Sequence, residues 1–103
     1  MIRFLCLIAT EDRLWNMKRA FRRVEESHPG MMEGRCWSAW GLAARPEEIP
    51  QMMEDAKDCD FAIVYFHGGA QLLPGFESVW KQLTAKMPVY FESSLPEEIA
   101  ELL

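Results

Sequence analysis

Two apolar runs, broken only by Arg3 near the start of the first, constrain the fold of this chain more than any other feature. Residues 2–9 read IRFLCLIA and residues 61–66 read FAIVYF, with no regular exchange of apolar and polar side chains. A strand with one face in water alternates the two kinds, whereas a continuous apolar run is typical of a parallel strand buried on both faces. The sequence therefore predicts two strands at the centre of a parallel sheet.

Segments with a single apolar face follow these runs. Apolar residues recur there every three or four positions, which predicts helices packed by one side. Thr10 or Asp12 is placed to cap the first helix, and the HPG sequence at 28–30 ends it. Pro46 and the two glutamates after it are typical of the first turn of the second helix. The three apolar stripes are Leu14, Met17, Phe21 and Val24; Ile49, Met52, Met53 and Ala56; and Phe76, Val79, Trp80 and Leu83.

Two further strands complete an alternating order of strands and helices. We expect an edge strand over residues 35–40, a fourth strand over 89–91, and a last helix that starts at Pro96. Such alternation implies right-handed crossovers and helices on both faces of the sheet. The predicted fold is α/β: a small doubly wound, flavodoxin-like three-layer domain with a four-stranded parallel sheet in the order 2-1-3-4. We expect residues 1–103 to form this single domain, as an N-terminal module of a longer protein.

Trp37 and Trp40 stand three residues apart in the predicted edge strand. On a strand they would point to opposite faces, so we expect at least one of them to meet the covering helices. Contact with a large flat ligand is the alternative.

Charge and cysteine content exclude several classes of protein. The net charge of −5 argues against a nucleic-acid partner, which requires a basic face. No stretch approaches the roughly 20 apolar residues that cross a bilayer, so we expect no membrane association. The three cysteines are widely spaced and form no C-x-x-C pair, which favours free thiols in the cytoplasm. The local basic cluster of the first helix is interpreted as a solvated face and comprises Arg13, Lys18, Arg19, Arg22 and Arg23.

Polar residues and glycines follow the predicted strands at their carboxyl ends, where ligands bind in sheets of this kind. If the first and third strands are neighbours, a carboxylate and an imidazole meet at one crevice, and a glycine pair lets backbone amides approach a ligand. The predicted ligand-binding residues are Thr10, Glu11, His67, Gly68, Gly69 and Glu92. Each also has a purely structural interpretation, as a helix cap, a surface charge or a turn. No catalytic triad, phosphate-binding loop or receiver-type acceptor Asp is present at these positions.

Three segments together resemble the N-terminal part of the large subunit of cobaltochelatase, which is related to the H subunit of magnesium chelatase. They are IATEDRL, CDFAIVYFHGG and LPGFESVWKQL. The positions that match the family pattern are Thr10, Asp12, Leu14, Asp60, His67, Gly68, Gly69 and Gly75.

The resemblance implies a role in inserting Co²⁺ or Mg²⁺ into a tetrapyrrole for a cobalamin-type cofactor. In that family the large subunit binds the tetrapyrrole and works with ATPase subunits, so this segment alone is expected to be non-catalytic and to bind the tetrapyrrole or a partner subunit. The alternatives are a flavodoxin-like domain that binds a small molecule or cofactor, and a pure protein-interaction domain that forms homo-oligomers.

Overall fold

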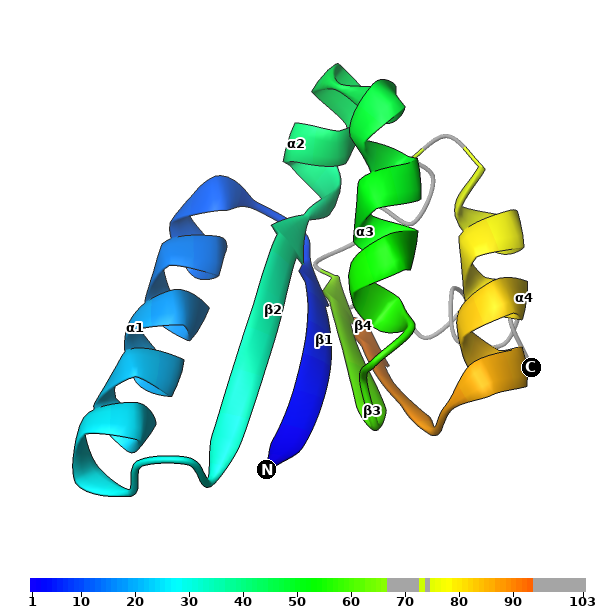
Figure 1. Cartoon of the computed structure of the whole chain (residues 1–103). Helices are drawn as coiled ribbons and strands as arrows, with labels where there is room; N and C mark the ends of the chain where they lie inside the picture. The colour runs from blue at the N-terminus through cyan, green and yellow to red at the C-terminus, as the bar shows by residue number, and fades with distance from the viewer. Residues whose placement is uncertain (67–72, 74, 94–103) are drawn as a thin grey trace.

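The computed structural model describes residues 1–66, 73 and 75–93. Within these, strands and helices alternate along the chain (Figure 1). The elements are β1 (Ile2–Ile8), α1 (Glu11–Ser27), β2 (Met32–Ser38), α2 (Ala39–Ala44), the 3-10 helix η1 (Pro46–Glu48), α3 (Ile49–Ala56), β3 (Phe61–Phe66), α4 (Phe76–Lys86) and β4 (Val89–Ser93). The predicted last helix lies outside the described residues.

The four strands form one parallel sheet in the order β2-β1-β3-β4, which confirms the predicted flavodoxin-like topology. In the register of the sheet, Cys6 on β1 lies beside Cys36 on β2 and Ile63 on β3. Two residues further along the strands, Tyr65 on β3 lies between Ile8 on β1 and Glu92 on β4. The carboxyl end of β1 is also tied to α2, because the Trp40 N–H donates to the Ala9 carbonyl over 3.1 Å.

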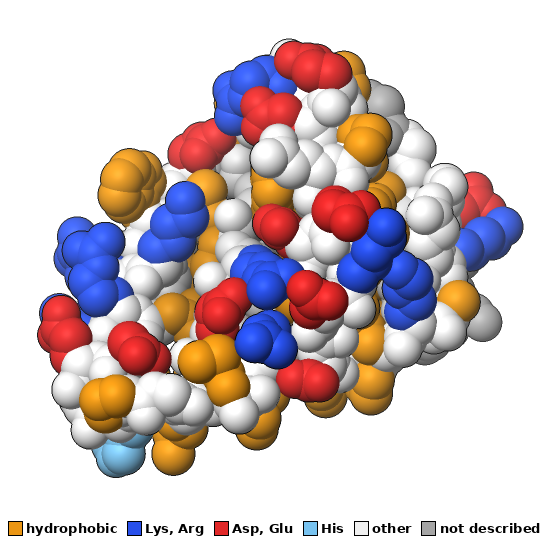
Figure 2. Space-filling model, in the orientation of Figure 1, with side chains coloured by type: hydrophobic (Ala, Val, Ile, Leu, Met, Phe, Trp, Pro, Cys, Tyr) orange, Lys and Arg blue, Asp and Glu red, His pale blue; other side chains and the backbone are white. Residues whose placement is uncertain are grey.

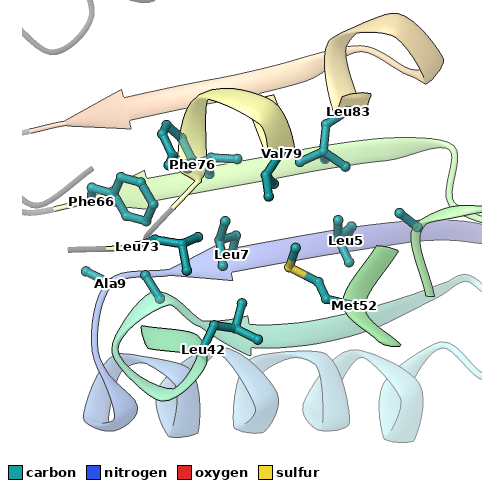
Figure 3. Close-up of a cluster of buried hydrophobic side chains, with 14 of the residues drawn as sticks. Leu5, Leu7, Ala9, Leu42, Met52, Phe66, Leu73, Phe76, Val79 and Leu83 are labelled. Carbon is teal, nitrogen blue, oxygen red and sulfur yellow. The ribbon is translucent and has the colours of Figure 1, made fainter. Parts of the chain in front are cut away.

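The main core lies between the sheet and helices α3 and α4. Alternate residues of the two central strands point into it, among them Leu5 and Leu7 of β1 and Val64 of β3, all fully buried. Figure 3 shows Leu5 and Leu7 beside Met52 of α3 and Val79 and Leu83 of α4, and Val64 belongs to the same buried cluster. Continuous apolar runs in β1 and β3 therefore form one side of a helix-covered core, as the sequence predicts.

Helix α1 lies on the opposite face of the sheet and packs mainly against β2. Phe21 of α1 contacts Phe4 of β1 with 6.0 Å between ring centroids. Among the described residues no other helix shares this face, so β3 and β4 are less covered here than on the core side. Ile63 and Tyr65 are half-buried and Tyr90 is 53% exposed, whereas Ala62 and Val64 on the core side are fully buried.

The second strand differs from its predicted bounds. It spans Met32–Ser38 instead of residues 35–40, and a short helix that the sequence did not predict, α2, follows at once. Ser38 ends the strand because its Oγ accepts a hydrogen bond from the Gly41 N–H over 2.9 Å and so caps α2. Trp40 is therefore on a helix and 58% exposed, and the expectation that Trp37 and Trp40 lie on one strand is wrong. Trp37 does meet a covering helix, because it packs against the core beside α3.

Charged side chains line the outer strand of the sheet. Glu33 Oε1 lies 2.8 Å from Arg35 Nε, and Glu33 Oε2 lies 3.8 Å from Arg3 Nε of the neighbouring strand. Arg35 also lies 3.9 Å from Asp58. In the described part of the chain, no helix is both long enough and apolar enough to cross a membrane.

Candidate functional site

A groove of about 430 Å³ lies on the sheet face beside α1, toward the carboxyl ends of β1, β3 and β4. We call it the face groove. Three side chains from adjacent strands form one row across it: Ile8 and Tyr65 on its floor, and the exposed Glu92 at its rim on β4. Helix α1 forms its wall. The described residues that line the face groove are Ile8, Arg13, Asn16, Met17, Ala20, Ile63, Tyr65, Tyr90 and Glu92.

The face groove combines an apolar floor with one cation and one carboxylate. The Arg13 guanidinium lies over the Tyr65 ring, 5.7 Å from its centroid. The Tyr90 hydroxyl donates to Glu92 Oε2 over 3.2 Å. The negative charge of Glu92, and then this hydrogen bond, raise the pKa of Tyr90, so the phenol stays protonated and can serve as a donor. Arginine on an aromatic ring can present its donors to a carboxylate in a forked geometry.

A second hollow of about 530 Å³ follows the outer edge of β2 between α1 on one side and α2 and α3 on the other. We call it the edge groove. Figure 2 shows this hollow bordered by both acidic and basic side chains. It is lined by Glu11, Leu14, Lys18, Arg35, Cys36, Trp37, Ser38, Gly41, Leu42, Arg45, Glu48 and Asp55.

One end of the edge groove is a hydrogen-bonded cluster at the tips of β1 and β2. The Ser38 hydroxyl donates to Glu11 Oε1 over 3.1 Å while it accepts from Gly41. Arg45 Nη2 lies 3.8 Å from the same Glu11 oxygen. A β-carbon at position 41 would lie 2.7 Å from both Glu11 Oε1 and Ser38 Oγ, so the close approach of these groups requires glycine.

The middle of the edge groove is held by Asp55 of α3. Its carboxylate accepts from Trp37 Nε1 over 2.9 Å, and its backbone carbonyl accepts from Arg35 Nη1 over 2.7 Å. Arg35 and Trp37, which share the core-side face of β2, thus both donate hydrogen bonds to Asp55 of α3. These bonds fix the outer strand to α3.

Two cysteines lie side by side where α1 faces the edge groove. Cys36 is half-buried and lines the groove, whereas Cys6 on β1 is fully buried behind it. A hydrogen bond with the Cys6 thiol, and then the positive charge of Lys18, lower the pKa of Cys36. The same hydrogen bond, burial and the nearby charge raise the pKa of Cys6. Cys6 is therefore the thiol of the pair that keeps its proton.

The sequence-based site is distributed over these two grooves. Glu92 lines the face groove, whereas Glu11 lines the edge groove with Ser38. Thr10 is the N-cap of α1 by its backbone, without a cap bond from its side chain. His67, Gly68 and Gly69 lie outside the described residues, so the shared crevice of Glu11 and His67 stays a prediction. Within residues 1–66, 73 and 75–93, no three His, Cys, Asp or Glu side chains are grouped to hold a metal ion.

Sequence reasoning missed Arg13, Tyr65 and Tyr90 in the face groove and Cys36 in the edge groove. Tyr65 and Tyr90 were assigned only to strands, and Arg13 only to a solvated cluster. The alternation of side chains along a strand could have shown that Tyr65 is in the groove. Tyr65 and Ile63 lie on one face of the sheet, and Val64 points to the other. The pairing of Cys6 with Cys36 required the register of β2, which the predicted bounds did not give.

Comparison of the chain with models of protein families, with curated protein sequences and with solved structures found no match. The kinship with the chelatase subunits therefore stays a prediction that depends on the three segments quoted above.

Proposed function

We propose that this chain is a non-catalytic binding module whose face groove holds a flat, largely apolar ligand that carries a carboxylate, with a tetrapyrrole as the leading candidate. The observation that carries the proposal is the group formed by the exposed Tyr90 and the half-buried Tyr65 and Ile63 beside α1. The identity of the ligand class is taken from the chelatase resemblance. The cysteine content supports a cytoplasmic location for such a module.

The shape of the face groove suits a flat ligand. A β-sheet offers an extended, gently twisted surface, and here its aromatic side chains meet the wall of α1 at Met17 and Ala20. Ala20 leaves room along that wall because its side chain is small. A volume of about 430 Å³ is within the roughly 300–1,000 Å³ of small-molecule sites.

The polar groups at the rim suit a ligand with an acidic edge. Arg13 is exposed and lies on Tyr65, so it can turn its donors to a ligand carboxylate without losing its contact with the ring. The carboxylate of Glu92, which accepts a hydrogen bond from Tyr90, lies at the rim opposite Arg13. A ring system with a carboxylate near Arg13 and an N–H group or a metal ion near Glu92 matches this distribution of charge.

Titration with protoporphyrin IX, followed by the shift of its main absorbance band and by quenching of protein fluorescence, tests the proposal. We expect saturable 1:1 binding that Arg13→Met weakens about tenfold, corresponding to about 1.4 kcal/mol. Tyr90→Ala is expected to weaken it as well. Arg19→Met is the matched control, because Arg19 is on the same helix and does not line the groove. Equal affinities for the parent, Arg13→Met and Tyr90→Ala would refute the site.

The same titration separates the alternatives. Saturable binding of FMN without binding of porphyrin would favour a flavodoxin-like cofactor domain. No response to either ligand, with or without Co²⁺ or Mg²⁺, would favour a protein-interaction domain that contacts a chelatase ATPase subunit or a second copy.

The indoles of Trp15 and Trp40, which are 64% and 58% exposed, favour this second candidate function, a protein-interaction domain. Substitution of both by Ala, with the oligomeric state measured by sedimentation, tests it.

A further inference from the structure

The two thiols of the edge groove differ in access although they are neighbours. Cys6 and Cys36 are register partners on adjacent parallel strands, and both point to the face that α1 covers. Cys6 has no exposed surface, whereas Cys36 opens into a groove of about 530 Å³. A reagent in the groove can therefore reach Cys36 first and Cys6 only through it.

The surroundings of Cys36 favour its thiolate. Lys18 of α1 lines the same groove, and its ammonium is 5.9 Å from the Trp15 ring centroid. The neighbouring Cys6 thiol, and then the positive charge of Lys18, lower the pKa of Cys36. A thiolate that is accessible and next to a second cysteine has the environment of redox-active cysteines.

We propose that Cys36 is a site of reversible oxidation by hydroperoxides, with Cys6 as the resolving thiol. The Cys36 thiolate attacks the terminal oxygen of the hydroperoxide, the O–O bond breaks, and the alcohol (water in the case of hydrogen peroxide) leaves with a proton from solvent. Cys36 is then a sulfenic acid. The Cys6 sulfur attacks the Cys36 sulfur, the S–O bond breaks, and the hydroxide leaves as water with the Cys6 proton. Two thiols are oxidised and one peroxide is reduced.

The sheet geometry permits this disulfide with a small local movement. Adjacent strands are about 4.8 Å apart, which is within the roughly 4.4–6.8 Å between α-carbons that disulfides span. The β-carbons must approach to about 3.5–4.5 Å, so β2 must move toward β1 at this point. Within the described part of the chain β2 has a single strand neighbour, so it can move without breaking a second ladder there. The resulting strain makes the bond easy for a dithiol to reduce.

Cys59 provides an internal control in the same chain. It is also half-buried, but its thiol donates to the Asp55 carbonyl over 3.3 Å, and burial raises its pKa. It does not line the edge groove and is not a register partner of either other cysteine. The proposal therefore predicts that the three thiols react in a fixed order.

The test is peptide mapping of the whole chain after one equivalent of hydrogen peroxide. Arg13, Arg35 and Lys57 place the three cysteines in separate tryptic peptides. We expect a Cys6–Cys36 disulfide that dithiothreitol reverses, that Cys36→Ser abolishes and that Cys59→Ser leaves unchanged. In Cys6→Ala we expect Cys36 to stop at the sulfenic acid, which dimedone traps. Lys18→Met should slow the reaction about threefold, because the positive charge that favours the Cys36 thiolate is lost, whereas Lys81→Met should not.

Three outcomes would overturn the proposal: oxidation of Cys59 before Cys36, disulfides only between molecules, or an unmodified Cys36 at peroxide levels that oxidise free cysteine. Peptide mapping of the unsubstituted protein detects each of these outcomes, so the test holds even if Cys6→Ala fails to fold. The edge groove is separate from the face groove, so this result does not depend on the proposed ligand.

Discussion

The ring of Phe21 on α1 lies against the backbone of Gly34 on β2, in the space that the β-carbon of any other residue would occupy. The helix therefore reaches the sheet face by direct contact between an aromatic ring and a strand backbone. The same ring contacts Phe4 on β1. This contact sets the distance of α1 from the sheet, and with it the walls of both grooves.

Gly34→Ala is expected to destabilise the fold by about 1–3 kcal/mol, because the added methyl group must displace the Phe21 ring. Chemical denaturation of the single and double variants measures this. In a Phe21→Ala background the same substitution should cost much less, since the obstructing ring is gone. An equal cost in both backgrounds would show that the ring is not the obstacle.

Ser38→Ala is expected to lower the free energy of unfolding by about 1–2 kcal/mol. The Ser38 side chain is buried and satisfies the Gly41 N–H at the start of α2. Thr10→Ala is the control, because Thr10 is also an N-cap but makes no cap bond with its side chain. Thermal unfolding of both variants should show the larger loss for Ser38→Ala, and the reverse order would contradict the described caps.

Trp37→Phe keeps an aromatic ring but removes the donor to Asp55 and part of the packed side chain, so we expect a loss of about 1–2 kcal/mol. Asp55→Asn should cost less, because the amide oxygen still accepts from the indole. Trp15→Phe, at an exposed position, is the matched control and should leave the unfolding midpoint unchanged. An unaffected Trp37→Phe variant would show that the hydrogen bond contributes nothing net.

The rate of Cys36 alkylation by iodoacetamide should rise with pH around a midpoint below the ordinary thiol value of 9.0, because its pKa is lowered and the thiolate is the reactive form. Cys59 should show a midpoint above that value. In urea the two midpoints should converge, and in Lys18→Met the midpoint of Cys36 should rise. The charged and titratable groups around Cys36 are Cys6 of β1, Glu11 and Lys18 of α1, Arg35 of β2, and Arg45, Glu48 and Asp55 from the segment that includes α2 and α3.

The fold was predictable from sequence because its central strands are marked by composition alone. Residues 61–66 are apolar throughout, and the alternation with helical stripes gives the parallel order. The bounds of β2 were not predictable from its pattern, because its side chains include Glu33, Gly34 and Arg35. Glycine at position 34 weakens the strand signal, and only the packed Phe21 ring explains why glycine stands there.

The candidate grooves were less predictable than the fold. Glu11 follows β1, so its position at a strand tip is evident, but its hydrogen bond to Ser38 depends on where β2 ends. Arg13 has the sequence context of a solvated helix charge, and its contact with Tyr65 depends on how α1 lies across the sheet. Such relationships depend on register and helix placement, which local propensity does not determine.

The charged residues of the outer strand have a consequence for the protein at high concentration. β2 has one strand neighbour in the described structure, and such an edge is a template on which another chain can add. Glu33 and Arg35 hold ionic partners directly beside this edge. An incoming chain would have to strip water from those charges, so the residues that order the strand also oppose its growth into fibrils.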